Sequence, residues 1–495
     1  MKMTLHPQEA WQALPAGAWD EDAASHLLRR VGWSAQESEV SRALNEGLMP
    51  TLERLFPATP PTMPTPSSVV STEEDTPEFA ARARAAAPAE RRALFQEARE
   101  RSHAALLDLT LQWLAHASRP EYSASEKWTL FLGNIYVVAA QKVQNTALLC
   151  RHQEILRTNS AGSAPELTKA VLRSPAMIRY LDLQQNRRGA PNENFARELM
   201  ELFTLGIGHY SETDVKEAAR ALTGYVQRFG QFRFVPPQHD RTPKTVFGHT
   251  GNFDGDSVID LIYARKAAAT HLPARMTQFY LTEEPLPAPH LDALGEWWRG
   301  TGYDLHDLPH RFFSSRLFFD PQFRGTFIKS PVQFYLGMVQ DFSLDVPPLP
   351  RRLEPAFRRM GQVLFDPPNV RGWTGGRAWI SSTTLEARRL LARALFQPLD
   401  ESRLNADEQS AIAAARAAGA SSFTVGDSTL SPLAAVPANE AADRLVRTLL
   451  PLRVGDPYRL ALAAALGTSG PAVRPMARVR NAIVAVLETP EYQLC

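Results

Sequence analysis

Apolar residues recur at the spacing of an amphipathic helix over most of this sequence, and this repeat limits the chain mainly to helical folds. The stretch AASHLLRRVGWSAQESEVSRALNEGLMPTLERLF predicts two helices separated by Gly32, with Ser34 as the N-cap of the second. The pattern continues through residues 76–116, EKWTLFLGNIYVVAAQKV and PELTKAVLRSPAMIRYLDL. Strand-like runs are confined to FRFV at 232–235 and TVF at 245–247, which could form one small hairpin.

The expected fold is therefore mainly α: a large multi-helical array with long irregular loops and at most one small β-hairpin. A chain of 495 residues exceeds one ordinary hydrophobic core. We expect a multi-helical domain over residues 20–400 and a C-terminal helical subdomain, residues 401–495, packed on it. Residues 57–75 are rich in Pro, Ser and Thr and predict an extended, poorly packed surface loop.

Composition excludes several classes of function. With 54 Lys+Arg against 53 Asp+Glu, no net field draws the chain to nucleic acid or to an anionic membrane. Cys150 and Cys495 are too few for a disulfide framework or a cysteine zinc site. The amino-terminal stretch lacks an apolar export or membrane segment, and the twin arginine Arg29-Arg30 falls inside a helical pattern. We therefore expect a soluble, cytoplasmic protein without membrane insertion.

Residues 192–225, NENFARELMELFTLGIGHYSETDVKEAARALTGY, hold the densest group of acid, base and amide side chains. At about 100° per residue, Glu193, Arg197 and Glu201 fall on one stripe of a helix, opposite an apolar face. Asn192 is the predicted N-cap of this helix and Gly206 its predicted C-cap. A second helix follows, with Ser211 and Asp214 in capping-box relation.

The stripe has two interpretations. It is either an exposed salt-bridge ladder, with each pair contributing about 0.2–0.5 kcal/mol, or a site. In the second case Arg197 is buried against Glu193 or Glu201, and Glu198 or Glu201 faces a cleft as base or ligand. Under that interpretation we expect Arg197 to lie close to the loop formed by residues 239–244.

Residues 189–225, GAPNENFARELMELFTLGIGHYSETDVKEAARALTGY, resemble the signature of the bacterial domain-of-unknown-function 1800 family. Other blocks resemble the family in the same order, namely HLLRRVGW, ALLCRHQEILRTNSAG, SPAMIRYLDLQQNRRG, HDRTPKTVFGHTGNFDGDSVIDLI, FIKSPVQFYLGMV and LFDPPNVRGWTGGRAWISSTTLEAR. The resemblance implies a large, mostly helical, biochemically uncharacterised protein. Relatives are often exported and often neighbour sulfatase-like proteins in genomes, which implies a sulfatase-like protein as a candidate partner.

The sequence departs from the family pattern at one block. The family carries a tryptophan and two histidines where Leu132, Gly133 and Ile135 stand, and a further histidine where Asn159 stands. The resemblance therefore implies that chemistry carried by those imidazoles is lost here, which leaves open whether other groups replace them.

Two loops supply further candidates. In HDRTPKTVFGHTGNFDGD, the side chains of His239, Asp240 and Lys244 are the expected neighbours of the glutamate-rich helix. The alternate acidic residues after them fail the calcium-loop pattern, and Asp256 or Ser257 is the expected N-cap of the next helix. In FDPPNVRGWTGGRAWISSTTL the planar side chains could grip a sugar or an anion, or pack into the core, and the candidates are Arg371, Trp373 and Arg377.

Two functions remain open on the sequence, because it holds no GxSxG, Walker A, GxGxxG or HExxH motif. We favour a binding protein or degenerate enzyme that recognises a protein or glycan partner through a polar cleft around NENFARELMEL. The alternative is a hydrolase in which catalysis is carried by Glu193, Arg197, Glu198, Glu201, His239 and Asp240. The expected ligand-binding residues are Asn192, Asn194, Lys244, Arg371, Trp373 and Arg377. The cofactor is unknown, and a divalent metal is the candidate.

Overall fold

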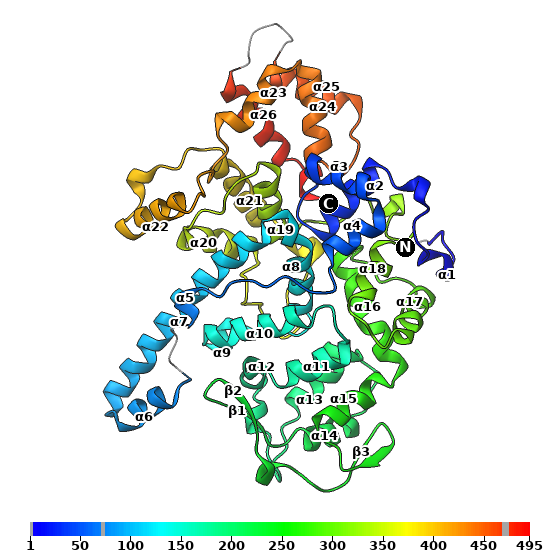
Figure 1. Ribbon diagram of the computed structural model, residues 1–495, viewed down its shortest axis with the longest axis vertical. Coiled ribbons are helices and arrows are strands. Elements are labelled where there is room, and N and C mark those ends of the chain that lie inside the picture. The colour runs from blue at the N-terminus through cyan, green and yellow to red at the C-terminus, as the bar shows by residue number, and fades with distance from the viewer. Residues whose placement is uncertain (1–2, 71–74, 468–474) are drawn as a thin grey trace.

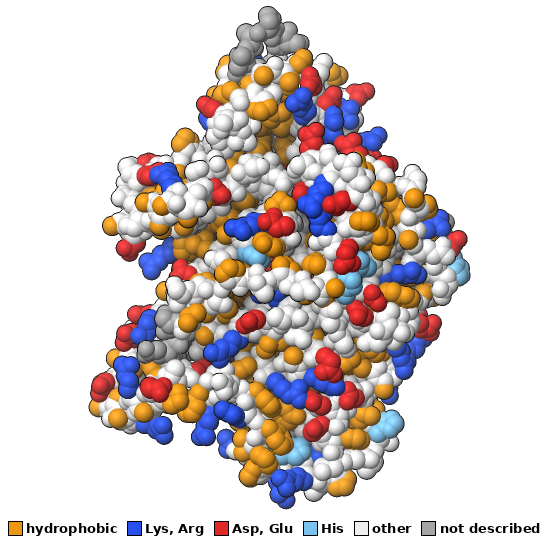
Figure 2. Space-filling model, viewed as in Figure 1, with side chains coloured by type: hydrophobic (Ala, Val, Ile, Leu, Met, Phe, Trp, Pro, Cys, Tyr) orange, Lys and Arg blue, Asp and Glu red, His pale blue; other side chains and the backbone are white. Residues whose placement is uncertain are grey.

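The fold is mainly α, as predicted, and helices make up 62% of it. The computed structural model describes residues 3–70, 75–467 and 475–495. Figure 1 shows α23, α24, α25 and α26 at one end of an elongated body, and the strands with α13, α14 and α15 at the other. Acidic and basic side chains are interspersed over the face seen in Figure 2, as the balanced composition predicts. Among the described helices, none has the length and hydrophobicity needed to cross a membrane.

The amino-terminal part confirms the predicted helix break at Gly32, whose N–H donates to Leu28 O at 2.9 Å. The next helix begins at Glu37 with Gln36 at its N-cap, so the predicted cap at Ser34 is wrong. Trp33, Ser34 and Ala35 are buried ahead of this helix, and Trp33 donates its indole N–H to a carbonyl of α7. The helices of this part are α1 (Pro7–Ala10), α2 (Glu21–Val31), α3 (Glu37–Glu46), α4 (Leu48–Leu55), α5 (Ser67–Val70), α6 (Pro77–Ala85), α7 (Pro88–Ala117), α8 (Pro120–Gly133) and α9 (Ala140–Val143).

The segment 57–75 has no regular structure over residues 57–66, as predicted for a surface loop, but its last part packs on the scaffold. Its helix α5 lies along α7 (Figure 1), and Val69 is only 2% exposed. Asp75 accepts two hydrogen bonds from Arg179, at 2.8 and 2.9 Å. Residues 71–74 of the segment lie outside the described residues. A few side chains make the contacts, among them Met63, Val69 and Asp75, and average composition does not reveal them.

The central part contains two hairpins rather than one. Strand β1 (Tyr225–Arg228) pairs with β2 (Gln231–Phe234), and β3 (Lys244–Val246) pairs with β4 (His249–Gly251), both antiparallel. Each turn is a Phe-Gly dipeptide with positive φ at both residues, which suits the two-residue turn of a tight hairpin. Each predicted run therefore pairs with its own sequence neighbour. The helices here are α10 (Thr146–Thr158), α11 (Ala164–Leu172), α12 (Pro175–Tyr180), α13 (Asn194–Glu198), the π-helix η3 (Leu199–Thr204), α14 (Glu212–Ala221), α15 (Gly255–Tyr263), α16 (Lys266–Tyr280), α17 (Ala288–Gly300) and α18 (Asp307–Phe313).

The N-cap of α15 is Asp254, whose carboxylate accepts from Ser257 N at 2.9 Å. The prediction of Asp256 or Ser257 at that position is therefore wrong by two or three residues. Asp256 instead pairs with Arg173 of the segment after α11. The acidic spacing in this loop thus serves one helix start and one ion pair.

The helices α23, α24, α25 and α26 share a hydrophobic cluster with Trp33, α7, α19 and α21, so these four helices pack on the preceding part of the chain. A second cluster lies around α2, α8 and the helices from α10 to α18. The helices of this part are α19 (Pro331–Asp341), α20 (Pro350–Met360), α21 (Ser382–Leu395), α22 (Ala406–Ala417), α23 (Asp427–Ala435), α24 (Ala438–Leu449), α25 (Asp456–Leu466) and α26 (Met476–Leu487).

The two clusters are tied together by buried cations on α2. Arg29 and Arg30, the twin arginine of the sequence, are only 2% and 1% exposed. Arg30 donates to Tyr280 O at 2.7 Å and to Leu281 O at 3.0 Å, at the carboxyl end of α16. Arg29 donates to Thr448 O at 2.6 Å, at the carboxyl end of α24. Both guanidinium groups therefore satisfy carbonyls that a helix end leaves unpaired.

Two lysines are buried in the same region. Lys127 of α8 donates to Arg30 O at 2.8 Å and to Gly32 O at 2.9 Å. Lys329 lies 3.6 Å from the ring centroid of Tyr492. Burial lowers the pKa of Lys127 and of Lys329 to about 7.

We predict that the free energy of unfolding rises with pH between about 7 and 9.5, by up to about 1.4 kcal/mol per pH unit for each buried lysine. The folded pKa of Lys127 lies below that of the unfolded chain, so in this window the unfolded state binds a proton that the folded state does not. Urea unfolding across this range measures the slope. Lys127→Met should roughly halve the slope, because Lys329 still contributes, and an unchanged slope in that variant would contradict the assignment.

Candidate functional site

The helix at the centre of the predicted site changes type along its length. Helix α13 ends at Glu198 and continues as the π-helix η3 from Leu199 to Thr204, where Leu205 N donates to Met200 O at 2.9 Å. Its predicted limits are nearly right. Asn192 Oδ1 accepts from Asn194 N at 2.9 Å, although Glu193 holds the N-cap position, and Gly206 follows the end with a positive φ of 85°. A π-helix within a helix frequently marks a functional site.

The π-helix breaks the predicted stripe of charges. Arg197 donates to Glu193 at 3.1 Å, as predicted, and makes a two-fold contact with Glu212 of α14, with both distances 2.7 Å. Glu201 is not a partner of Arg197, because its carboxylate accepts from Tyr210 and Arg371 instead.

The prediction that Arg197 is substantially buried is wrong, since 33% of its side chain is exposed. The capping box of α14, formed by Ser211 and Asp214, is present as predicted and places Glu212 at the start of that helix. The guanidinium of Arg197 therefore lies at the solvent-exposed edge between α13 and α14. The hydrogen bonds that Arg197 donates to Glu212 raise the pKa of Arg197 above its usual range. Arg197 thus belongs to an exposed ladder.

We predict that Arg197→Ala lowers the free energy of unfolding by less than about 1 kcal/mol, the usual range for exposed ion pairs. Denaturant unfolding measures this value. Arg220→Ala is the matched comparison, because Arg220 is more buried and bonds both Glu217 and Asp240. It should cost more than Arg197→Ala, and the reverse order would contradict the assignment of the ladder.

Two carboxyls next to the ladder lie in different environments. Glu201, whose side chain is 17% exposed, accepts from Tyr210 Oη at 2.8 Å and from Arg371 Nη2 at 3.1 Å. Glu198 is half-buried and has no hydrogen-bond donor or ion-pair partner among the described residues. Burial, and then the charge of Glu201, raises the pKa of Glu198. Neighbouring carboxyls that differ in this way can divide the roles of acid and anion.

The loop that carries Arg371 is fixed at two points. Trp373 N donates to Asn134 Oδ1 at 2.8 Å, and Arg377 N donates to Glu283 Oε2 at 3.2 Å. The side chain of Arg371 is 65% exposed and reaches Glu201 from this loop. Trp373 is half-buried, whereas Trp379 further along is packed in the core.

These contacts bring three sequence blocks together. Asn134 stands between Gly133 and Ile135, the two positions where the family resemblance implies histidine. It binds the loop of Arg371, and Arg371 binds Glu201 of the π-helix. We call the surface formed by Glu198, Glu201, Tyr210 and Arg371 the carboxylate face.

The other predicted residues have local roles. Asp240 accepts from Arg220 at 2.8 Å, and although burial alone would raise the pKa of Asp240, bonds from Arg220 and Thr242 hold it well below its usual range. His239 is buried with Nδ1 3.0 Å from Thr223 O. Lys244 donates to Asp240 O at 2.6 Å. These three side chains hold their loop against the end of α14. None of the bonds described for them goes to Arg197 or Glu198.

Asn192 and Asn194 also form hydrogen bonds with main-chain groups and amide side chains near the start of α13. Asn186 Oδ1 accepts from Asn192 N at 2.9 Å, and Asn194 Nδ2 donates to Leu181 O at 3.2 Å. Their side chains therefore position the start of α13. Sequence reasoning missed Glu212, Tyr210 and Asn134, because each acts on a residue from a different element.

We predict that Gly372→Ala destabilises the protein by at least about 1–2 kcal/mol, the cost of a left-handed conformation for a residue with Cβ. Gly372 has a φ of 81°, and a Cβ there would overlap Asn134 Oδ1. Gly375→Ala is the matched control, since nothing lies within 4 Å of its added Cβ. Thermal unfolding of both variants tests this, and equal stability would show that Asn134 does not anchor the loop.

Comparisons with known proteins agree with the resemblance seen in the sequence. A family model described as "Protein of unknown function (DUF1800)" matches residues 26–494, nearly the whole chain. Searches of curated proteins and of solved structures returned no match.

Proposed function

The chain belongs to the DUF1800 family of proteins of unknown function, and from that premise we propose that it is a binding protein that holds a hydroxyl-bearing ligand of the glycan type at the carboxylate face. The observation that carries the proposal is Glu198, a half-buried carboxyl without a partner among the described residues. A carboxylate removed from water gains from any donor that reaches it, and sugar hydroxyls are such donors.

Arg371 supplies the complementary groups. Its guanidinium has five N–H donors, and the hydrogen bond that joins it to another side chain goes to Glu201. Because 65% of this side chain is exposed, its other donors can reach the hydroxyl and ring oxygens of a bound sugar. The face therefore offers acceptor and donor groups side by side.

The block below the face supports binding over catalysis. Ile135 is 2% exposed and packs in the apolar cluster, and Asn159 donates its amide to Ile155 O at 2.8 Å. At these positions, where the family pattern has imidazoles, this chain has a core residue and an amide committed to its own helix.

A hydrolase is the alternative, and the pair of unlike carboxyls favours it. The raised pKa of Glu198 suits a general acid that protonates a leaving oxygen, while Glu201 provides a neighbouring negative charge. In this alternative Glu198 is the residue whose proton moves, and Arg371 orients the substrate.

The test is co-sedimentation of the full chain with insoluble cellulose, chitin and purified peptidoglycan. We expect binding to at least one of them, weakened at least tenfold by Glu198→Ala and by Arg371→Ala, because each removes a group that the ligand contacts. Glu212→Gln is the control, since this exposed residue belongs to the ladder and should leave binding unchanged.

Two results would decide against the proposal. Absence of binding to all three polysaccharides would reject it. Release of reducing sugar that is abolished by Glu198→Gln would identify the hydrolase instead. Binding through Glu198 should also weaken as pH falls through its raised pKa, because the protonated carboxyl loses its charge.

The partner and the location stay predictions. A sulfatase-like protein partner follows only from the family resemblance, and recognition of a protein instead of a glycan would use the same face. A cytoplasmic location follows only from the composition of the amino-terminal stretch.

A further inference from the structure

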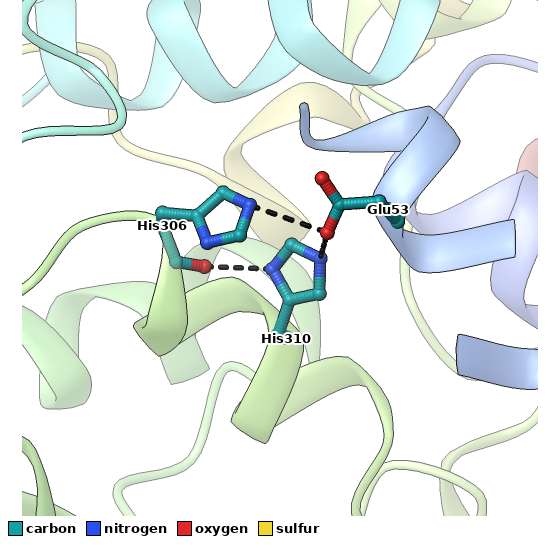
Figure 3. Close-up of side chains that lie close together, drawn as sticks. All are labelled: Glu53, His306 and His310. Atoms are coloured by element: carbon teal, nitrogen blue, oxygen red, sulfur yellow. Dashed lines mark hydrogen bonds and ion pairs between the residues drawn. The ribbon is translucent and has the colours of Figure 1, made fainter. Parts of the chain in front are cut away.

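A second polar cluster lies where α4 meets α18. His306 precedes α18 and His310 lies one turn later, so both imidazoles share one face, with ring centroids 4.3 Å apart. Glu53 of α4 points toward them, as Figure 3 shows. Its Oε2 lies 3.4 Å from His306 Nε2 and 3.4 Å from His310 Nε2. Figure 2 shows histidine side chains beside acidic ones at the surface over these two helices.

The hydrogen bonds of this cluster fix the state of His310. Its Nδ1 lies 2.7 Å from the His306 carbonyl oxygen, and a carbonyl oxygen can only accept, so Nδ1 carries the proton. The neutral ring then presents a lone pair at Nε2. Both Nε2 atoms are buried and have no hydrogen-bond partner among the described residues.

This arrangement sets acceptors against each other. The lone pair of His310 Nε2 faces a carboxylate oxygen of Glu53, and neither can donate to the other. A cation between them removes the conflict. A metal ion bound to all three side chains would supply that positive charge and accept the lone pair of each Nε2 atom.

We propose that Glu53, His306 and His310 bind a divalent transition-metal ion, with Zn²⁺ as the best fit. The three donor atoms all lie within 4.8 Å of one another. Bonds of about 2.0–2.1 Å at tetrahedral angles place neighbouring donor atoms about 3.3–3.4 Å apart, which matches the two 3.4 Å separations from Glu53. Two imidazoles with one carboxylate form a recognised zinc ligand set.

The surroundings support the ligands. The His306 carbonyl orients His310, as an outer hydrogen bond commonly does for a metal-bound imidazole. Asp304 Oδ1 accepts from His306 N at 2.7 Å and from Asp307 N at 3.0 Å, which fixes the start of α18. Phe56 lies edge-on to His310 and covers the apolar side.

The site is distinct from the carboxylate face. Figure 1 shows α4 and α18 near the amino terminus, in the middle of the body, and α13 at the end that carries the strands. The Glu53 side chain is 59% exposed, so three protein ligands leave the fourth tetrahedral position open to solvent. A bound ion would join α4 to α18 and keep one position for water or an exogenous ligand.

The test uses tag-free full-length protein freed of metal with a chelator. Titration with ZnCl₂ by calorimetry should give one equivalent, and CoCl₂ should give the visible absorption of tetrahedral Co²⁺. Glu53→Gln, His306→Gln and His310→Gln should each weaken Zn²⁺ binding at least tenfold. Zn²⁺ should raise the melting temperature of the wild type more than that of these variants.

Exposed residues away from the cluster provide the matched controls. Glu37→Gln and His249→Gln should bind Zn²⁺ as the wild type does. Glu53→Gln is the decisive variant, because its exposed side chain can change without disturbing the core. Zn²⁺ binding that is equal in Glu53→Gln and wild type, or loss of binding in the controls, would overturn the proposal. Failure of polysaccharide binding would leave it untouched.

Discussion

The fold depends on arginine side chains buried without a carboxylate hydrogen-bonded to them. A buried charge is costly unless hydrogen bonds satisfy it, and Arg29 and Arg30 meet this condition by bonding carbonyls at the carboxyl ends of α24 and α16. Those ends carry the negative pole of each helix. Helix α16 lies in one hydrophobic cluster and α24 in the other. Helix α2 bonds both and therefore links the two clusters. The chain after α16 then presents Glu283, which fixes the loop of Arg371 at Arg377 N, so the carboxylate face depends on the same anchor.

Local sequence signals were sufficient for the helical class and for some helix ends. The capping box of Ser211 and Asp214 and the left-handed Gly206 act over one turn of chain, so composition and spacing contain what they need. The π-helix is different. A wheel of regular pitch assigns Glu201 to the stripe of Arg197, and a change of pitch inside η3 reassigns it to Tyr210 and Arg371. Nothing in the apolar spacing of the sequence signals this change of pitch.

Contacts between distant segments explain the remaining differences. Arg371 and Glu201 are 170 residues apart, and both were predicted separately without any indication that they meet. The pair His306 and His310 has the four-residue spacing of two ligands on one helix face, a signal that the sequence does contain. That spacing alone is common. The third proposed ligand, Glu53, comes from α4, which the spacing does not indicate. Position in space, rather than residue type, separates these side chains from other histidines and glutamates.

The positions where the family resemblance implies histidines show why chemistry at the carboxylate face would rest on carboxyls. Ile135 contributes to the apolar cluster, and an imidazole there would be desolvated, so it would favour its neutral form. Gly133 differs, because an added Cβ would make only ordinary contacts with Leu156 and Gln153. Packing thus leaves no room for a polar side chain at Ile135, whereas there is room for a side chain at Gly133. The two positions therefore differ in whether they could accept a histidine. Between them Asn134 keeps the loop of Arg371 in place, so the face retains its shape while its titratable group is Glu198.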